Sequence, residues 1–321
     1  MIPGRPGTHP LFPDLEKPQP VLHADTAVVV SISGGKDSVV TLLKALETFG
    51  PAQVMAHHQL ILEDWPGTPE YCQAVCDGLG VPLYMTQAVY YGYACVQCRH
   101  HYLTLCPEPY CRKCSCREAR FLMLVDSVLD LVLWREMWPS LEVRFCTSYF
   151  KRDIFNRWAR ASRELLRAHP VIALGERWRE SKGRAKLPVL RERSKLAWML
   201  EWRPILDYRC MDVFRKMRAY GIEPHYCYKA QGMTGEDMYE RNVEGGPRMS
   251  CVMCFLKSAE QMRASYQIEA AKLVIDRGIE IEREIGHTIK HGQSLESMVA
   301  GGKPPCVSWE DARTAGREVS V

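Results

Sequence analysis

The segment Ser31–Ser38, which reads Ser-Ile-Ser-Gly-Gly-Lys-Asp-Ser, constrains the fold more than any other part of the sequence. It overlaps the end of a β-branched apolar run, Thr26–Ile32, that predicts a buried strand. After it, apolar residues recur at helical spacing through Val39–Leu46 until Gly50-Pro51 ends the pattern. A strand, a glycine turn and a helix in this order are typical of the first unit of an α/β fold.

The following residues continue this alternation. Gln53–His58 and Val81–Thr86 each predict a strand, and Thr68–Leu79 between them predicts a helix that ends at Gly80. Strands that alternate with helices favour a parallel, doubly wound, Rossmann-like α/β sheet. Further along, the same patterns predict helices near Arg117–Trp138, Tyr149–Ala168, Met211–Tyr220 and Ala259–Ile285, and strands at Val171–Gly175 and Trp202–Leu206.

We expect the chain to divide into three parts. Residues 1–25 are rich in proline and predict an extended tail. Residues 26–258 predict the α/β domain, with a cysteine-rich insertion at 91–118. Residues 259–321 predict a C-terminal helix and a tail.

The glycine turn has the composition of an anion site. The N-terminus of a helix presents free N–H groups and the positive end of the helix dipole. Gly34 and Gly35 allow close approach to phosphate oxygens, while Ser33 and Ser38 add hydroxyl donors and Lys36 adds charge. The segment matches neither G-x4-G-K-[ST] nor G-x-G-x-x-G. The alternative interpretation is a glycine turn with an incidental lysine.

Ser33–Ser38 resembles the pyrophosphate-binding loop of the adenine nucleotide α-hydrolase (PP-loop ATP pyrophosphatase) superfamily. That superfamily includes ATP pyrophosphatases, tRNA thiolation enzymes and phosphoadenosine phosphosulfate (PAPS) reductases. The resemblance implies a Rossmann-like fold that binds adenine nucleotide, here ATP with Mg²⁺. In ATP-using members it also implies cleavage between the α and β phosphates, which adenylates an acceptor and releases pyrophosphate.

Three further segments resemble motifs of the PAPS reductase-like branch, and with the glycine turn they cover about residues 26–258. They are Arg144–Lys151 with its Cys-Thr-x-x-x-Lys element, Gly175–Arg184 with its Gly-x-Arg-x-x-Glu-Ser-x-x-Arg element, and Trp202–Asp207 followed by Asp212-Val213. The resemblance adds Gly175 and Arg184 to the nucleotide-binding residues and implies catalytic roles for Lys36, Asp37, Lys151 and Arg177. Guanidinium groups suit bidentate contact with phosphate or sulfate. A surface ion pair is the alternative for each cation taken singly.

Cys251 and Cys254 form a chelating pair that resembles the carboxy-terminal pair of iron–sulfur members of this branch. Adenylylsulfate reductases carry a second pair, in a Cys-Cys element near their lysine, where this chain has Phe145 followed by Cys146. DNA-phosphorothioation enzymes of the Dnd type also carry clusters on this fold. We therefore expect a 4Fe–4S cluster on Cys146, Cys251 and Cys254, with Cys227 as fourth ligand or an open iron position. A thiol pair, a zinc site and inert burial are the alternatives.

A second group, Cys95-x2-Cys98-x12-Cys111-x2-Cys114, has the spacing of two metal-binding knuckles. Four thiolates suit tetrahedral Zn²⁺ and leave no open position, so we expect a structural zinc that fixes the insertion. Spare donors nearby leave open which four residues bind and whether a second cluster is present. They are Cys106, Cys116, His100 and His101.

Cysteine usage and hydropathy point to a cytoplasmic protein. The chain has 14 cysteines in 321 residues, and metal binding or redox chemistry explains such a number where disulfides are rare. The most apolar stretch, Phe121–Trp134, is interrupted by Asp126 and Asp130, which argues against a membrane span. The first residues lack the apolar core of a signal peptide.

The charge distribution favours an anionic partner. The net charge is only +4, but Arg144–Lys195 holds 15 Lys and Arg against 5 Asp and Glu. Such a segment suits a nucleotide or a nucleic acid. A solvated basic helix face is the alternative.

Taken together, the motifs favour an ATP-using enzyme that adenylates an acceptor in sulfur transfer. The acceptor would be a nucleic acid such as DNA or tRNA, and the sulfur donor a protein such as a cysteine desulfurase. Reduction of PAPS or adenylylsulfate to sulfite by a thioredoxin-like donor is one alternative. PAPS reductases use a Glu-Cys-Gly-Leu-His segment, where this chain has only Pro305-Cys306-Val307. A non-catalytic nucleotide-binding subunit is the other alternative.

Overall fold

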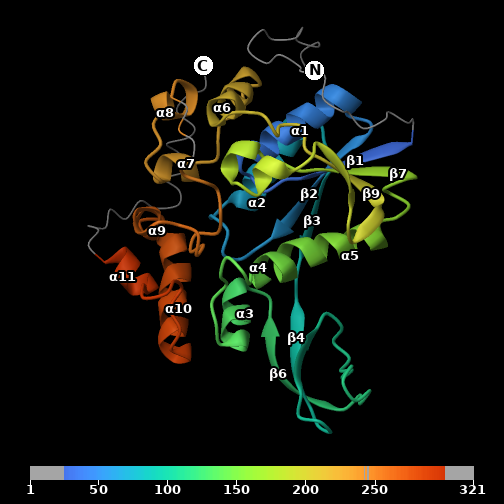
Figure 1. The fold of residues 1–321 in the computed structure, drawn as a ribbon, viewed down its shortest axis with the longest axis vertical. Coiled ribbons are helices and arrows are strands. Elements are labelled where there is room, and N and C mark those ends of the chain that lie inside the picture. Colours follow the sequence, from blue (N-terminus) through green and yellow to red (C-terminus); the bar gives the residue numbers. More distant parts are fainter. Residues whose placement is uncertain (1–24, 242, 244–245, 301–321) are drawn as a thin grey trace.

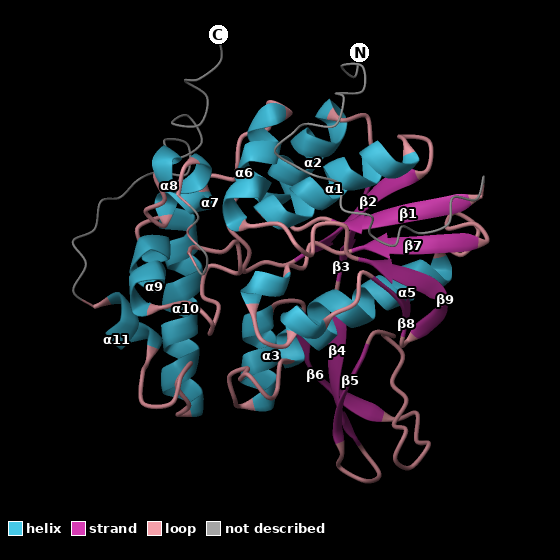
Figure 2. Ribbon diagram, turned by 45° about the horizontal axis from the view of Figure 1, so that its top comes forward, coloured by secondary structure: helices cyan, strands magenta, loops and turns pink. Residues whose placement is uncertain are grey.

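The computed structural model describes residues 25–241, 243 and 246–300. The predicted tail therefore lies outside the described residues except for Asp25, and Cys306 lies outside them as well. The central sheet has six strands in the order β3-β2-β1-β7-β9-β8 (Figures 1 and 2). The strands are β1 (Thr26–Ser31), β2 (Val54–Leu60), β3 (Leu83–Gln87), β7 (His169–Ala173), β8 (Leu190–Arg193) and β9 (Leu196–Trp202).

Neighbouring strands of this sheet run parallel except for β8, which pairs antiparallel with β9. Alternate side chains of β1 enter two separate cores, because successive residues of a strand point to opposite faces. Val28 and Val30 pack with one helix layer, whereas Ala27 and Val29 pack with the other. The doubly wound α/β fold is confirmed.

Helices cover both faces of the sheet (Figure 1). One layer consists of α1 (Lys36–Phe49), α2 (Thr68–Gly78) and α6 (Cys210–Ala219). The other face is covered by α5 (Asp153–Ala161), which follows the short α4 (Phe145–Thr147) and a π-helical turn at Ser148–Arg152. Cys72 and Cys76 on α2 are fully buried in the first layer.

The cysteine-rich insertion forms a small sheet of its own that projects from the main body (Figure 2). Its strands β4 (Tyr90–Cys95), β5 (His101–Thr104) and β6 (Ala119–Val125) are antiparallel, with β4 in the middle. The predicted helix at Arg117–Trp138 is wrong over β6, because that apolar run pairs with β4. The helix α3 (Val128–Arg135) begins only after Ser127, whose side chain accepts a hydrogen bond from the Asp130 N–H group.

Three other predicted elements have different bounds. Of the helix predicted at Tyr149–Ala168, only α5 is a regular α-helix. The strand expected at Trp202–Leu206 instead ends at Trp202, two residues before Pro204. The helix expected at Ala259–Ile285 is two helices, α9 (Ala259–Tyr266) and α10 (Glu269–Ile285). The short helices α7 (Cys227–Ala230), α8 (Gly235–Tyr239) and α11 (Leu295–Val299) complete the described chain.

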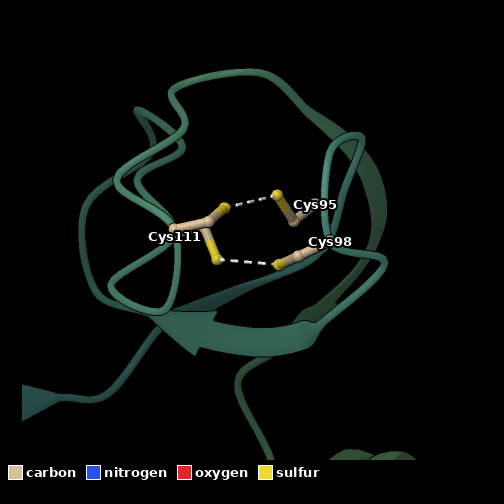
Figure 3. A group of neighbouring side chains, drawn as sticks. Cys95, Cys98 and Cys111 are labelled. Carbon is tan, nitrogen blue, oxygen red and sulfur yellow. Dashed lines mark hydrogen bonds between the residues drawn. The ribbon is translucent and has the colours of Figure 1, made fainter.

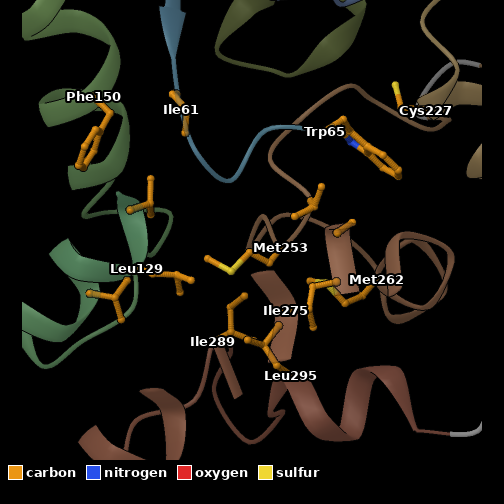
Figure 4. Packing of buried hydrophobic residues seen from close by; sticks show 14 of the residues in the cluster. Ile61, Trp65, Leu129, Phe150, Cys227, Met253, Met262, Ile275, Ile289 and Leu295 are labelled. Atoms are coloured by element: carbon orange, nitrogen blue, oxygen red, sulfur yellow. The ribbon is translucent and has the colours of Figure 1, made fainter. Parts of the chain in front are cut away.

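The C-terminal helices share one apolar core with α3 and the segment that follows β2. Figure 4 shows side chains of this core, including Ile61, Leu129, Met253, Ile275 and Leu295, converging from these elements. This packing brings residues near 250 against the residues between β2 and α2. None of the described helices combines the length and the apolar character needed to cross a bilayer.

Candidate nucleotide and cysteine site

The glycine turn between β1 and α1 is closed by hydrogen bonds within the loop. The Ser33 N–H group donates to Ser38 Oγ at 3.1 Å, and Ser38 Oγ–H donates to the Gly35 carbonyl oxygen at 2.8 Å. Gly34 has a φ of 74°, in the left-handed region that favours glycine. Gly35 caps α1 without a side-chain hydrogen bond, and the first N–H group of the helix, that of Lys36, donates to the Tyr228 hydroxyl.

Asp37 is the centre of an ion-pair group beneath the loop. Its carboxylate lies 2.5 Å from Lys36 Nζ and 2.7 Å from Arg177 Nε. Burial alone would raise the pKa of Asp37, but the two cations together lower it below its usual value. Lys36 and Arg177 are themselves buried, and Arg177 also donates to the Tyr208 carbonyl oxygen.

Gly175, just after β7, touches the start of α1. A Cβ atom at this position would lie 2.8 Å from the Asp37 carbonyl carbon and 2.9 Å from the Ser38 nitrogen. These are backbone atoms, which cannot move aside as a flexible side chain can. Glycine is therefore required here for close approach between the two strand-to-helix connections, which the resemblance alone could not explain.

A cavity of about 370 Å³ opens at the carboxyl ends of β1, β2 and β7. In parallel α/β sheets, ligands bind at this edge. Seven of the predicted nucleotide-site residues line it: Ser33, Gly35, Asp37, Ser38, Lys151, Gly175 and Arg184. The side chains of Lys36 and Arg177 instead surround Asp37, and a Cβ on Gly34 would contact Met249.

Acidic side chains hold Arg184 at the cavity wall. The guanidinium group donates to Glu180 and lies 3.5 Å from Glu176 Oε1. Arg248 lies across the same opening, where its Nη2 donates to the Glu180 carbonyl oxygen at 3.2 Å. These two arginines and Lys151 are the cations at the cavity wall.

The structure adds cavity residues that sequence reasoning missed. His58, Asp64 and Tyr228 all line the cavity, and the Tyr228 hydroxyl accepts a hydrogen bond from the Lys36 N–H group at 2.9 Å. His58 and Asp64 lie at or just beyond the end of β2, as the glycine loop lies beyond β1. The rule that parallel strands end at one edge could have indicated both residues. Tyr228 lies 192 residues from Lys36 in the sequence and had no such signal.

Lys151 connects the cavity with the cysteine centre, by which we mean Cys146, Cys251 and Cys254. Burial would lower the pKa of Lys151, but the neighbouring Cys251, Asp64, Cys254 and Cys146 raise it above its usual value when they are ionised. Burial itself raises the pKa of the Cys251 and Cys146 thiols, so Asp64 is the neighbour that is charged at neutral pH. The structure therefore brings the three predicted ligands to one half-buried cation.

The cysteine centre lies beside Asp64, because Cys251 Sγ donates to Asp64 Oδ1 at 3.5 Å. Cys227, in contrast, is fully buried, and its strongest interactions with charged groups are with Lys257, Lys36 and Asp64. Three partly buried thiols next to a cation fit a cluster that keeps one iron position open. Their sulfurs do not converge as tightly as the ligands of a single ion would.

The four knuckle cysteines of the insertion do converge on one point. The sulfur atoms of Cys95, Cys98, Cys111 and Cys114 all lie within 4.8 Å of one another, and Figure 3 shows three of them pointing into the same space. Cys106 is exposed, and Cys116 Sγ instead accepts a hydrogen bond from the Glu118 N–H group at 3.3 Å. Within the described part of the chain, only these four residues form a group with the compactness of a single-ion site.

Comparisons with known proteins give limited similarity. No protein-family model matches the chain. An uncharacterised 37.8 kDa protein of Escherichia phage 186 is 30% identical over 129 residues, which is 39% of this chain and 34% of that protein. The chain therefore matches about a third of the length of this curated relative.

Two solved structures are similar at low identity. One is a PAPS reductase from Candida auris in a phosphate complex, with a TM-score of 0.39 and 13% identity over 66% of this chain and 81% of that one. The other is the U34-tRNA thiolase NcsA from Methanococcus maripaludis with its [4Fe-4S] cluster. Its TM-score is 0.31, with 11% identity over 92% of this chain and 82% of that one. At these values neither similarity assigns an activity to the chain.

Proposed function

We propose that the protein is a PP-loop, PAPS reductase-like enzyme that cleaves ATP between the α and β phosphates during sulfur transfer. The acceptor oxygen would attack the α phosphorus while the bond from that phosphorus to the bridging oxygen breaks. Pyrophosphate would leave, and the acceptor would carry AMP. The position of Lys151 carries this proposal, because one half-buried cation borders both the cavity of the glycine loop and the cysteine centre.

The loop would hold the pyrophosphate end of the nucleotide. Ser33, Gly35 and Ser38 line the cavity at the N-terminus of α1, where the helix dipole and backbone N–H groups favour phosphate. Mg²⁺ on the phosphates would offset the charge that develops on the leaving group. Lys151 and Arg184 would contribute the protein's positive charge at the cavity wall.

For Lys36, Asp37 and Arg177 we propose positioning roles beneath the loop. Their ion pairs join the start of α1 to the segment after β7. Phosphoryl-type displacement depends mainly on positioning and on electrostatic stabilisation, so a fixed loop contributes to the rate. Lys36 would contact phosphate directly only after leaving Asp37.

The cysteine centre would hold a 4Fe–4S cluster, with Cys227 as fourth ligand or with one iron open. An open iron would supply a site that binds a sulfur atom. A protein such as a cysteine desulfurase would deliver that sulfur, and the acceptor would be a nucleic acid, DNA as in Dnd-type phosphorothioation or tRNA. The four knuckle cysteines would hold a structural Zn²⁺, since four thiolates complete a tetrahedral site.

Product analysis tests the proposal. Anaerobically purified protein receives Mg-ATP in one reaction and PAPS with reduced thioredoxin in another. We expect AMP and pyrophosphate from ATP, and no sulfite from PAPS. In Lys151→Met the rate of pyrophosphate release should fall roughly 100-fold or more, as when a preorganised electrostatic donor is removed. Lys195→Met removes an exposed lysine that pairs only with Asp153 across the surface and should leave the rate unchanged.

Two results would contradict the proposal. Sulfite from PAPS without pyrophosphate from ATP would assign the protein to the reductases. ATP binding without any product, in the presence of a sulfur donor and a nucleic acid, would assign it a non-catalytic role.

A further inference from the structure

The small sheet β5-β4-β6 presents an aromatic row beside the knuckle cysteines. Tyr102, Tyr93 and Phe121 are directly opposite one another across the three strands, so their side chains share one face. Ring centroids are 5.8 Å apart for the first pair and 5.9 Å for the second. Phe121, at the outer end of the row, is 51% exposed.

Other apolar side chains of the insertion are exposed as well. Leu124 lies on the same face and is 47% exposed, and Val96 in the first knuckle is 64% exposed. Tyr110, just before the second knuckle, is 46% exposed. Four exposed apolar side chains on this small sheet and its knuckles suit a contact surface.

The insertion that carries the aromatic row also carries exposed positive charges without acidic partners. Five exposed cations lie in the two knuckles and at the start of β6, against only two acidic residues in the same stretch, Glu108 and Glu118. None of the five forms an ion pair with any residue that the structure describes. They are Arg99, Arg112, Lys113, Arg117 and Arg120.

The basic segment Arg144–Lys195 differs from the insertion, because many of its cations form ion pairs. Several of its cations pair with acidic groups of the main body: Arg177 with Asp37, Arg184 with Glu180, and both Arg191 and Arg193 with Glu201. Part of its charge therefore stabilises the fold and the cavity. Arg157, Arg160 and Arg163 on and after α5 remain exposed and form the rival surface for an anionic partner.

We infer that the β5-β4-β6 sheet with its knuckles is a docking surface for single-stranded nucleic acid. An exposed aromatic ring can stack on a base of any sequence, and cations around it can neutralise the phosphates on either side. The bases of duplex DNA could not stack on the Phe121 ring, because they are already stacked on one another. This inference deepens the proposed function. It rests on that function only where it takes the bound nucleic acid to be the acceptor.

Binding of fluorescent single-stranded RNA and DNA of about 16 nucleotides to the full-length protein without ATP tests the inference. Phe121→Ala should raise Kd by roughly 5- to 150-fold, because it removes the ring that stacks on a base. Phe121→Leu should raise Kd by a similar factor, because leucine is apolar but cannot stack. Phe121→Tyr should retain the affinity. The corresponding duplex should bind more weakly than either single strand.

Salt dependence tests the phosphate contacts. In the triple variant Arg112→Gln, Lys113→Gln, Arg117→Gln, the slope of log K against log salt should become shallower by about 2 units. Removing three charges from α10 provides the matched control, because Lys272, Arg277 and Arg283 are exposed and already paired with acidic residues. That control should keep the slope of the unmodified protein.

Four results would overturn the inference. The first two are absence of binding by the unmodified protein and equal or tighter binding of the duplex. The third is loss of affinity in Phe121→Tyr while Phe121→Leu retains it. The fourth is loss of affinity only when the rival surface of Arg157, Arg160 and Arg163 is changed. Zinc content and the thermal transition of each variant show that the knuckles remain folded. Pyrophosphate release, measured separately, distinguishes failure of this inference from failure of the proposed function.

Discussion

Arg177 Nε donates to Asp37 Oδ1 at 2.7 Å, although the two residues are 140 positions apart in the sequence. The contact joins the connection after β7 to the first turn of α1. Since the glycine loop lies directly before that turn, the ion pair fixes the loop before any ligand arrives. A preorganised loop loses little conformational freedom when it binds phosphate.

We predict that Arg177→Met destabilises the fold by about 1.5 to 3 kcal/mol, because it leaves the half-buried Asp37 carboxylate with one cation instead of two. In Asp37→Asn/Arg177→Met the loss should be smaller than the two single losses combined, by about 0.5 to 3 kcal/mol. Urea denaturation measures both quantities. Arg241→Met, which breaks an exposed pair with Glu236, should change the free energy of unfolding by less than about 1 kcal/mol. Equal effects at Arg177 and Arg241 would show that the buried pair does not fix the loop.

We predict that Gly175→Ala weakens ATP binding and destabilises the fold by about 1 to 3 kcal/mol, because the new methyl group meets the backbone of Asp37 and Ser38. The nucleotide affinity can be measured by calorimetry, and the stability by denaturation. Gly183→Ala is the matched control, since the nearest atom to its Cβ would be Ser181 Oγ at 4.0 Å. Unchanged nucleotide affinity in Gly175→Ala would separate this contact from the nucleotide site.

The first half of the sheet was predictable because its signals are local. The run Thr26–Ile32, the glycine turn and the helical spacing after it all lie within one unit, and β1 and α1 form there. The error at Arg117–Trp138 has the opposite cause. Its first half is an apolar run whose pairing partners on β4 lie 24 to 35 residues earlier, and such a run does not distinguish a strand from a helix.

His57 predicts an acid sensitivity of the fold. Burial against Phe155 and Trp158, with a smaller effect from His58, lowers the pKa of His57 to about 3. The unfolded chain takes up a proton below about pH 6.5, whereas the folded chain does not until about pH 3. The free energy of unfolding should therefore fall as the pH falls through this window, with a contribution from His57 of up to about 4 to 5 kcal/mol.

Urea denaturation between about pH 7.5 and pH 4.5 measures this contribution. His57→Gln removes one titrating group and should make the pH dependence shallower, while His225 and His58, whose pKa values burial also lowers, keep the remainder. His291→Gln replaces an exposed histidine and should leave the dependence unchanged. If His57→Gln and the unmodified protein lose stability in parallel, His57 is not the cause.

The two cysteine groups should bind different metals independently. We predict that Cys251→Ser and Cys254→Ser lose iron and acid-labile sulfide but keep zinc, whereas Cys114→Ser loses zinc and keeps iron. Cys114 belongs to the compact four-sulfur group, while Cys251 and Cys254 belong to the centre beside Lys151. Elemental analysis of anaerobically purified protein gives both values. Cys116→Ser, a cysteine outside both groups, should keep both metals. Zinc without iron in the unmodified protein would rule out the cluster.

The candidate site was only partly accessible from the sequence. Ligand spacing, which is a local property, selected the four knuckle cysteines and the pair Cys251 and Cys254, whereas Cys146 came from the family resemblance. The orientation of Lys36 was not accessible, since it depends on Asp37, on Arg177 from another strand connection and on the rings of Phe214 and Tyr228. A cation in a glycine loop can face the ligand or the fold, and only tertiary contacts decide between them.

The central claim is that the enzyme cleaves ATP between the α and β phosphates. ATP labelled with ³²P at the α position tests this claim most directly. We predict that the label appears in AMP or in an adenylated acceptor, with one pyrophosphate released for each label transferred. Recovery of the label in ADP, with release of inorganic phosphate, would show cleavage at the wrong bond and contradict the account.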